Sequence, residues 1–351
     1  MKKIYIKIKL RKAKNHVQKR KKYRITQKKG KNKSYFNIVI KLIILWISII
    51  LIIISTPFNN KNDLYINGYN ITSDKWIIIT ASNPPTNDLI NLEREINHEK
   101  IVVIGNKKTI DSNWDIFKNS MKLIYLSIKD QKKLGYHILK FLNDDSYYRK
   151  NIGYLFAIQH GAKEIYEIDE KLNYSPKILS FIDINNSYIS YGKDANNKMI
   201  NPYAYFGEPN IWPRGFIYKD IFSVNNKTFY YGHYSKIKLK PMLYQGLING
   251  IPDVDSIFLL TNSKMNKSFN IHFLHNYPLL YLPGNYVPIN SRNTKFSYEV
   301  FPFLMLPITI KESISEIIRG YIMEKFIYRY NGVIVYHNNK VHNNNKNILN
   351  T

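Results

Sequence analysis

The stretch YRKNIGYLFAIQHGAKEIYEIDE, residues 148–170, decides the fold of this chain. Its first part places Ile152, Leu155 and Phe156 at helical spacing, so these side chains form one apolar stripe. Gly161 then supplies the left-handed conformation that commonly ends a helix. Residues 163–168, KEIYEI, are then predicted to form a strand. A helix that leads directly into such a strand is the repeating unit of an α/β fold.

The same alternation continues on the N-terminal side of this stretch. Short apolar runs bounded by turn residues predict three further strands, at 76–80, 100–104 and 122–126. Asn87 is placed to cap a helix that runs to about residue 97. Strands that alternate with helices predict a doubly wound, mostly parallel sheet.

The C-terminal side of the chain gives weaker signals. We expect loops and short strands across 173–297, with one helix at 242–249 inside this region. A last helix is predicted over about 313–330, and the Asn-rich tail after Asn338 reads as loose.

Acidic side chains gather at the carboxyl end of the strand in the deciding stretch. Glu167, Asp169 and Glu170 stand there, and open α/β sheets bind ligands outside the carboxyl ends of their strands. Alternate residues of an extended strand share a face, so the carboxylates of Glu167 and Asp169 can converge on Mg²⁺ or Mn²⁺. Such an ion would bridge two phosphates and stabilise a departing diphosphate. A solvated acidic loop would have the same sequence, so both readings stay open.

Two basic residues stand before the helix that leads into this strand. Arg149 and Lys150 could meet a diphosphate near the helix N-terminus, where charge and the helix dipole both attract anions. A solvated basic turn is the alternative.

A second acid-x-acid pair, Asp253 and Asp255, follows the helix expected at 242–249. One carboxylate could accept a proton from an acceptor hydroxyl while the other caps the local turn, and we expect Asp255 to face the site. Turn capping alone is the alternative. The aromatic segments 201–207 and 212–215 could stack on sugar rings or belong to the core.

The first 57 residues differ in composition from the rest. Residues 1–35 carry 16 Lys or Arg and no Asp or Glu, and residues 36–57 are long and apolar enough for one transmembrane helix. This pattern predicts a cytosolic basic tail and a lumenal remainder. A basic run can also bind nucleic acid, but the apolar span behind it favours a membrane anchor. The lumenal part then divides into a stem, a catalytic-type domain and a disordered tail at 58–74, 75–342 and 343–351.

The overall composition excludes some functions. The chain has no cysteine, which excludes disulfides, zinc–thiolate sites and a cysteine nucleophile. Its formal charge is +27, and outside the basic tail 36 Lys or Arg stand against 25 Asp or Glu. This excess suits an anionic substrate such as a nucleotide diphosphate, or it reflects a general drift toward Lys, Asn and Ile.

A series of short blocks resembles the STELLO-type family of glycosyltransferase-like proteins. The blocks follow the family's order from about residue 75 to 342, and the stretch 148–162 with its acidic cluster is the longest of them. The other blocks are NPY at 201–203, FG at 206–207, WPRG at 212–215, QG at 245–246, NG at 249–250, PDVDS at 252–256, VPIN at 287–290, LP at 306–307 and RGY at 319–321. Residues 249–255 are also similar to a motif of the reversibly glycosylated polypeptides, which act on UDP-arabinose.

The resemblance implies a GT-A-like domain in the Golgi membrane that uses a UDP-sugar donor and Mn²⁺ or Mg²⁺. It places the acidic cluster at the metal-binding DxD position, with Glu167 in place of the first Asp. We accordingly predict metal ligands at Glu167, Asp169, Glu170 and His342, although His342 also reads as an ordinary surface histidine. The predicted catalytic residues are Asp253 and Asp255. The predicted substrate-binding residues are Thr80, Ser82, Gly105, Asn106, Arg149, Lys150, Asn151, Trp212, Arg214 and Gly215.

Two functions fit these features. The first is a type II membrane glycosyltransferase that transfers sugar from a UDP-sugar to an unidentified glycan or protein acceptor, without binding nucleic acid. The second is a non-catalytic membrane scaffold that keeps the fold and binds protein partners. The fold is compatible with both functions, but the presence of both acidic pairs in the sequence favours the enzyme.

Overall fold

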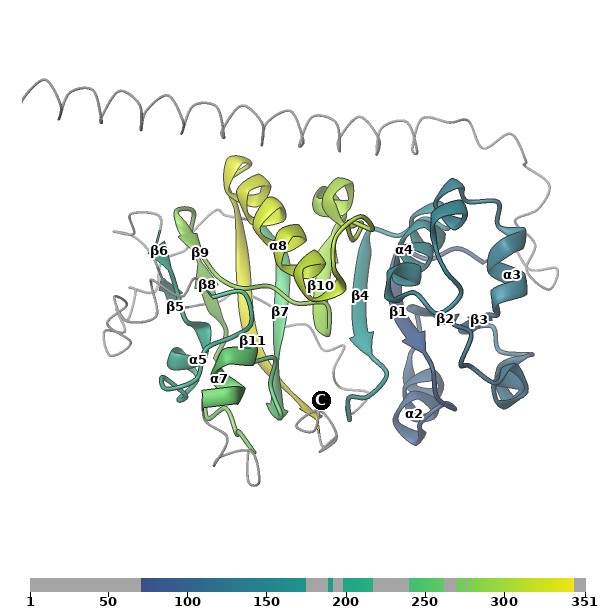
Figure 1. Ribbon diagram of the computed structural model, residues 1–351, viewed down its shortest axis with the longest axis horizontal. Coiled ribbons are helices and arrows are strands. Elements are labelled where there is room, and N and C mark those ends of the chain that lie inside the picture. Colours follow the sequence, from purple (N-terminus) through teal and green to yellow (C-terminus); the bar gives the residue numbers. More distant parts are fainter. Residues whose placement is uncertain are drawn as a thin grey trace, which may run out of the picture. The chain divides into compact units, whose positions relative to one another are not determined.

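The computed structural model describes residues 71–174, 189–191, 198–216, 240–261, 270–275 and 277–343, and the account below concerns these residues. They form an α/β fold around one mixed sheet with the strand order β3-β2-β1-β4-β10-β7-β11-β8-β5 (Figure 1). No helix in this part of the chain has both the length and the apolar character needed to cross a membrane. The span predicted at residues 36–57 lies outside the described residues.

The first half of the sheet is parallel, as the sequence predicted. Strands β3, β2, β1 and β4 run in one direction, with Thr80 of β1 registered between Ile104 of β2 and Asp169 of β4. Helices connect them in the alternating pattern of a doubly wound fold. In chain order these elements are β1 (Lys75–Ala81), α2 (Asn87–Glu95), β2 (Lys100–Gly105), η1 (Asp111–Phe117), β3 (Leu123–Leu126), α3 (Ile128–Lys133), η2 (His137–Phe141), η3 (Tyr147–Arg149), α4 (Lys150–Gln159) and β4 (Glu164–Asp169).

The second half of the sheet is mixed. Strand β10 (Asn293–Ser297) lies antiparallel between β4 and β7 (Lys240–Gly250), and β11 (Gly332–Asn343) then pairs parallel with β7. Strand β8 (Leu279–Tyr281) is antiparallel to β11, with the short β5 (Ile189–Tyr191) at the edge. The smaller elements are β6 (Lys198–Met199), α5 (Pro202–Tyr205), α7 (Ser256–Thr261), β9 (Asn285–Tyr286), η6 (Tyr298–Phe303) and the long α8 (Glu312–Arg329).

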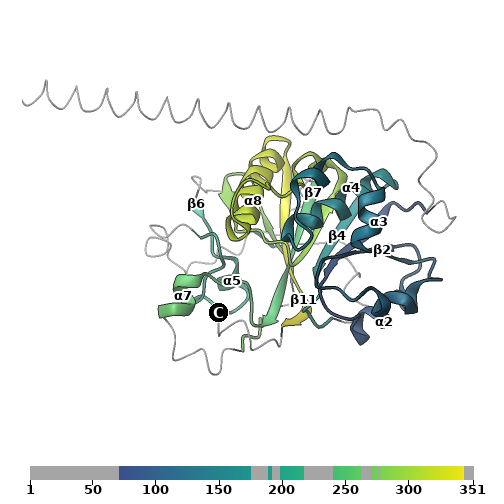
Figure 2. The ribbon, with the colours of Figure 1, turned by 45° about the vertical axis from the view of Figure 1, so that its right-hand side comes forward.

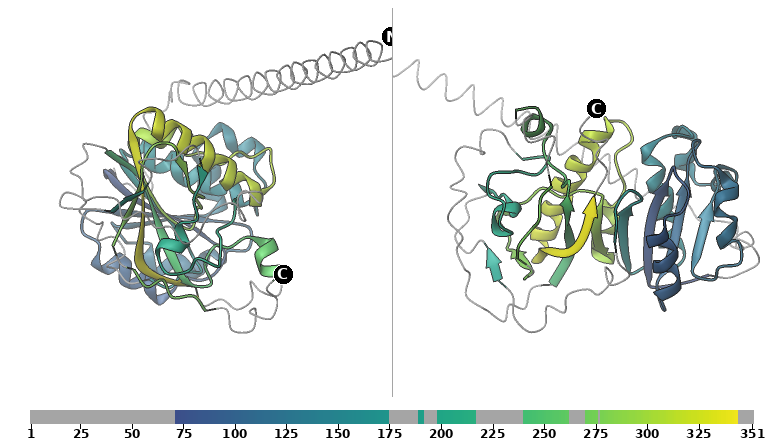
Figure 3. Two further views of the ribbon diagram at one scale, coloured as in Figure 1. Left: turned by 90° about the vertical axis from the view of Figure 1, so that its left-hand side faces the viewer. Right: turned by 90° about the horizontal axis from the view of Figure 1, so that it is seen from below.

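Helices cover both faces of the sheet. Helices α4 and α8 lie on one face and α2 lies on the other, as the turned views show (Figures 2 and 3). Helix α4 packs closely on β1 because Gly153 has no side chain, and a Cβ there would lie 2.7 Å from Ile78 Cγ2. On the opposite face, Leu89 and Leu92 of α2 join a buried core with Trp114. The doubly wound α/β prediction is therefore confirmed, although the sheet is not uniformly parallel.

Three local predictions were wrong. Residues 242–249 belong to the central strand β7 and not to a helix. All of them except Tyr244 are buried, Gln245 and Asn249 included, so the run lacks the alternation that would have marked it as a strand. The residues after Asn338 continue β11 as far as Asn343 instead of forming a loose tail. The cap of α2 is Thr86, whose side chain accepts a hydrogen bond from the backbone of Leu89, and not Asn87.

Candidate functional site

A cavity lies at the point in the sheet where the chain changes the direction in which it adds strands. From β1 the chain proceeds to β2 on one side and later returns through β4 on the other, so β1 and β4 meet at a topological switch point. A pocket of about 260 Å³ opens at the carboxyl ends of these strands, where open α/β sheets bind ligands. It is lined by Thr80, Ser82, Ile104, Asn106, Lys108, Asp145, Ser146, Tyr147, Arg149, Lys150, Asp169, Glu170, Lys171, Ser291, Arg292 and Glu312.

The start of α4 contributes two buried cations to this pocket. Arg149 and Lys150 are each only 2% exposed. Arg149 donates from Nε to Gln131 Oε1 at 2.8 Å and from Nη1 to Asp144 Oδ1 at 3.3 Å, whereas its buried Nη2 has no partner among the described residues. Burial lowers the pKa of the Arg149 guanidinium, and Asp144 opposes this shift. A buried donor without an acceptor is costly, so Nη2 is suited to an anionic ligand.

Lys150 is held by the loop that precedes β10. Its Nζ donates to the carbonyl oxygen of Ser291 at 2.8 Å and lies 5.3 Å from the ring centre of Tyr147. Burial lowers the pKa of Lys150, and the nearby carboxylates of Glu167 and Asp169 oppose that shift. One Nζ hydrogen bond is accounted for, and an ammonium group has three donors.

Asp169 forms an ion pair at the wall of the pocket. Its Oδ2 accepts a hydrogen bond from Arg292 Nε at 3.2 Å, and its Oδ1 accepts one from the backbone of Lys171 at 3.0 Å. Burial by itself would raise the pKa of Asp169, but Arg292, the Lys171 backbone and Lys150 outweigh it and lower the pKa below its ordinary value. Asp169 is therefore a charged residue of the pocket.

Glu170 connects the end of β4 to the loop that follows β1 through hydrogen bonds. Its Oε2 accepts hydrogen bonds from the backbone of Ser82 at 2.6 Å and of Asn83 at 3.2 Å, and its Oε1 accepts one from Asn83 Nδ2 at 3.0 Å. Burial raises the pKa of Glu170, and the two backbone N–H groups oppose this shift. Both oxygens thus have partners within the protein.

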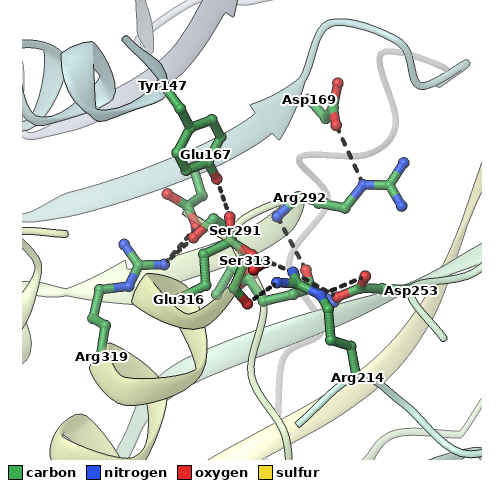
Figure 4. A network of polar contacts seen from close by, with 12 residues as sticks. Tyr147, Glu167, Asp169, Arg214, Asp253, Ser291, Arg292, Ser313, Glu316 and Arg319 are labelled. Carbon is green, nitrogen blue, oxygen red and sulfur yellow. Dashed lines mark hydrogen bonds and ion pairs between the residues drawn. The ribbon is translucent and has the colours of Figure 1, made fainter. Parts of the chain in front are cut away.

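Glu167 lies deeper than the pocket and is not part of its lining. The residue is fully buried, and its Oε1 accepts a hydrogen bond from Arg319 Nη2 of α8 at 3.0 Å while its Oε2 accepts one from the hydroxyl of Tyr154 on α4. Arg319 also donates to Leu304 O at 3.0 Å and to Ser291 Oγ. This ion pair joins β4, α4, α8 and the loop before β10 (Figure 4).

The predicted metal ligands do not come together. Glu167 is inside the protein, Asp169 and Glu170 have protein partners, and His342 lies outside the pocket lining with its ring 6.0 Å from that of His272. Within residues 71–343, as far as they are described, no group of three His, Asp or Glu side chains is placed to hold a metal ion. The donor set for Mn²⁺ or Mg²⁺ is not assembled, and the expected cofactor stays a prediction.

The second acid pair divides differently from our expectation. Asp255 Oδ1 accepts a hydrogen bond from the backbone of Ile257 at 2.8 Å at the start of α7, so Asp255 takes the capping position that we had expected for Asp253. Asp253 forms a two-pronged pair with Arg214, with Nε–Oδ1 and Nη2–Oδ2 distances of 3.1 Å. The expectation that Asp253 caps the turn is therefore wrong, whereas a ligand-facing role for either acid stays a prediction. The reason is that residues 252–255 are not an extended strand, and Asp255 leads into a helix.

A chain of polar contacts links Asp253 to the wall of the pocket. Arg214 also contacts Glu316 of α8, and Glu316 accepts a hydrogen bond from the hydroxyl of Tyr147, which lines the pocket (Figure 4). Burial raises the pKa of Glu316 to about 7, and Arg319 and the backbone of Ser291 oppose this shift. The ion pair with Arg214 also favours the carboxylate form.

The remaining predicted residues have local structural contacts. Asn151 is buried and clamps the backbone of Leu306 with hydrogen bonds of 2.8 and 2.9 Å. The half-buried ring of Trp212 packs edge-on against Phe258 with 4.8 Å between centroids. Gly105 is close to the pocket but does not line it, and a Cβ there would lie 2.5 Å from the Tyr125 hydroxyl. Gly215 adopts φ +92°, which explains the choice of glycine.

The pocket thus brings together seven of the sixteen predicted residues: Thr80, Ser82, Asn106, Arg149, Lys150, Asp169 and Glu170. Our sequence reasoning missed Arg292, Arg319 and Glu316, which lie far along the chain from the residues they contact. Two signals were available: Glu316 and Arg319 are charged residues in the middle of the helix predicted at 313–330, and Arg319 begins the RGY block of the family resemblance.

The structure is thus an α/β domain with a switch-point pocket, and buried cations and a helix N-terminus, groups that attract anions, line this pocket. No protein-family model matches the chain. Over 276 residues, 76% of the chain, it is 33% identical to the "Probable glycosyltransferase STELLO1" of Arabidopsis thaliana, and over 281 residues it is 32% identical to "Probable glycosyltransferase STELLO2" of the same plant. The chain is a glycosyltransferase-like protein of the STELLO family. It spans about a third of the length of these curated relatives, 35% and 36% respectively.

Proposed function

We propose that this protein is a glycosyltransferase that binds the diphosphate of a UDP-sugar in the switch-point pocket. The observation that carries the proposal is the Arg149 guanidinium, which is 2% exposed, lines the pocket and has an Nη2 without a partner among the described residues. In this proposal a bound anion accepts a hydrogen bond from Nη2, which is itself buried. Homology to two probable glycosyltransferases narrows the class of phosphorylated ligand to a sugar donor.

The surroundings of Arg149 support a diphosphate in particular. Lys150 lies beside it with Nζ donors to spare, and both residues stand at the start of the ten-residue helix α4. Backbone N–H groups of a first helical turn attract anions, and an arginine and a lysine add charge-assisted hydrogen bonds. Thr80, Ser82 and Asn106 supply uncharged polar groups at the neighbouring strand ends for the rest of the nucleotide.

The acceptor would be handled by Asp253. Arg214 fixes the orientation of this carboxylate, and the contacts through Glu316 to Tyr147 connect it to the donor pocket. A carboxylate in this position can hold or deprotonate an acceptor hydroxyl. Asp255, as a helix cap, has no part in this proposal.

The proposal includes a site of action in the Golgi membrane, with the domain on the lumenal side. It is supported by the charge and apolar pattern of residues 1–57, which fits a cytosolic tail and a single anchor. Protease treatment of sealed microsomes should shorten the chain only by its basic tail. Digestion of the large domain without detergent would contradict this topology.

Calorimetric titration of the full chain, purified in mild detergent, tests donor binding. We expect UDP and one or more UDP-sugars to bind and ADP and GDP to bind more weakly. Arg149→Lys, which keeps the charge but loses the fork geometry, should weaken UDP binding by about 10-fold or more. The matched control Arg94→Lys, on an exposed position of α2, should leave the affinity unchanged. Absence of binding by every nucleotide would overturn the proposal.

A non-catalytic scaffold remains the second candidate, because one acid of each pair is engaged within the protein. Glu167 is bonded to Arg319, and Asp255 caps α7. A scaffold would bind UDP-sugars, or none, without turning them over. Release of UDP from a UDP-sugar, measured with a coupled assay, separates the two candidates. Only the enzyme would transfer the sugar to an acceptor or, slowly, to water, and each transfer releases UDP.

A further inference from the structure

We propose that Arg292 takes the place of a divalent metal ion in this protein. In this inference, which rests on the proposed function, the donor diphosphate is held by Arg149, Lys150 and Arg292 and requires no Mn²⁺ or Mg²⁺.

The carboxylates of the cluster are not arranged as ligands. At a diphosphate site Mg²⁺ is usually held by one or two protein carboxylates together with the phosphates and water, so at least one carboxylate must be free to face the ion. Glu167 is fully buried in its pair with Arg319, and Glu170 has both oxygens bonded to Ser82 and Asn83. Asp169 and Glu170 are the two residues of this cluster that line the pocket, and Asp169 faces a guanidinium there.

The position of Arg292 is fixed by its backbone and its side chain together. Its backbone N–H donates to Asn290 Oδ1 at 3.0 Å, and its carbonyl oxygen accepts a hydrogen bond from the backbone of Asp169 at 3.0 Å. Its Nε donates to Asp169 Oδ2 at 3.2 Å. Figure 4 shows the two Nη atoms on the side that faces away from Asp169 and the other residues drawn. Asp169 is thus a positioning residue that holds the guanidinium for another anion.

The charge of the pocket suits a polyanion better than a cation. Five basic and four acidic side chains line it, and two of the acids, Asp169 and Glu170, are already bonded within the protein. A site for a bare divalent ion needs an excess of negative ligands. A guanidinium presents parallel N–H donors that match two phosphate oxygens, so Arg292 can supply the neutralising charge that a metal supplies elsewhere.

The test is a titration of the full chain with UDP by calorimetry, in EDTA and in excess MnCl₂. We expect the two dissociation constants to agree within about threefold. Arg292→Ala should weaken UDP binding about 10–100-fold in both buffers. The UDP affinity of Arg292→Lys should lie between those of wild type and Arg292→Ala, because lysine keeps the charge without the two parallel N–H donors of a guanidinium. Arg94→Ala is the matched control, and melting curves verify that each variant is folded.

The outcomes separate this inference from the proposed function. Wild-type binding that is lost in EDTA and restored by Mn²⁺ would overturn the role of Arg292, while the proposed function would stand. This arm uses no variant, so it does not depend on the folding of Arg292→Ala. Equal UDP affinity of wild type and folded Arg292→Ala in EDTA would also overturn it. Failure of UDP to bind in either buffer would remove the proposed function and this inference together.

Discussion

The end of β4 and the loop before α7 each carry an acid-x-acid pair, and the two pairs make similar kinds of contact in the structure. In each, one acid is committed to the architecture: Glu167 to the buried Arg319, and Asp255 to the start of α7. The other acid is paired with an arginine in a partly exposed position, Asp169 with Arg292 and Asp253 with Arg214.

The two regions differ in how they separate their acids. On β4 the two side chains share a face but stand about 7 Å apart along the strand, so the first lies under the helices and the second at the pocket. Before α7 the chain turns, and the second acid becomes the helix cap. An acid-x-acid pattern therefore specifies two carboxylates without specifying that both face one ligand. The following four changes test this division of roles.

Glu167→Gln should have the largest effect. The substitution leaves Arg319, 1% exposed, without its counter-charge, and breaking a buried pair costs about 3–5 kcal/mol. Urea unfolding followed by tryptophan fluorescence would measure the free energy of unfolding, with the exposed Glu95→Gln as the control. If Glu167→Gln were stable and bound UDP more weakly than wild type in buffer with Mn²⁺ but equally well without it, Glu167 would instead be a metal ligand.

Asp253→Asn should lower sugar transfer by about 100-fold and leave UDP affinity unchanged. This is the lower end of the usual contribution of a positioned acid–base group, since Arg214 already engages the carboxylate. Turnover and calorimetry on the same preparation give both quantities, and the exposed Asp115→Asn serves as the control. Full turnover by Asp253→Asn would remove this residue from the acceptor site.

Asp255→Ala should cost about 1 kcal/mol of stability, the usual value for a lost helix cap, and leave turnover intact. Denaturant unfolding and the UDP-release assay measure the two effects. Ser256→Ala, one position along the same turn and exposed, is the control. Loss of turnover without loss of stability would restore the assignment that the sequence pattern favoured.

Asp169→Asn should have the smallest effect. Its pair with Arg292 is partly exposed to solvent, with side-chain exposures of 29% and 15%, and such pairs contribute about 0–1 kcal/mol. UDP affinity in EDTA should fall by no more than about fivefold, through poorer placement of Arg292. A much larger loss, confined to buffers with Mn²⁺, would identify Asp169 as a metal ligand and break the parallel between the two pairs.

The sequence by itself determined the first half of the fold. The runs at 76–80, 100–104 and 122–126 and the stretch 148–170 each form the predicted element, because alternation of short apolar runs with an amphipathic helix is a local property. It also placed Arg149, Lys150 and Asp169 at one pocket, because parallel strands bring their carboxyl ends to the same edge. The family resemblance was likewise readable from short blocks, and the comparisons confirmed it.

Only the tertiary structure decided the rest. The run 242–249 is buried except at Tyr244 and has no period that separates strand from helix, and its pairing with β10 and β11 made it a strand. The partners of the carboxylates were equally hidden, since Arg292 and Arg319 lie 123 and 152 positions from Asp169 and Glu167. Whether a carboxylate meets a ligand, a guanidinium or a backbone N–H depends on which distant segment packs against it, and that is fixed only when the sheet and its helices assemble.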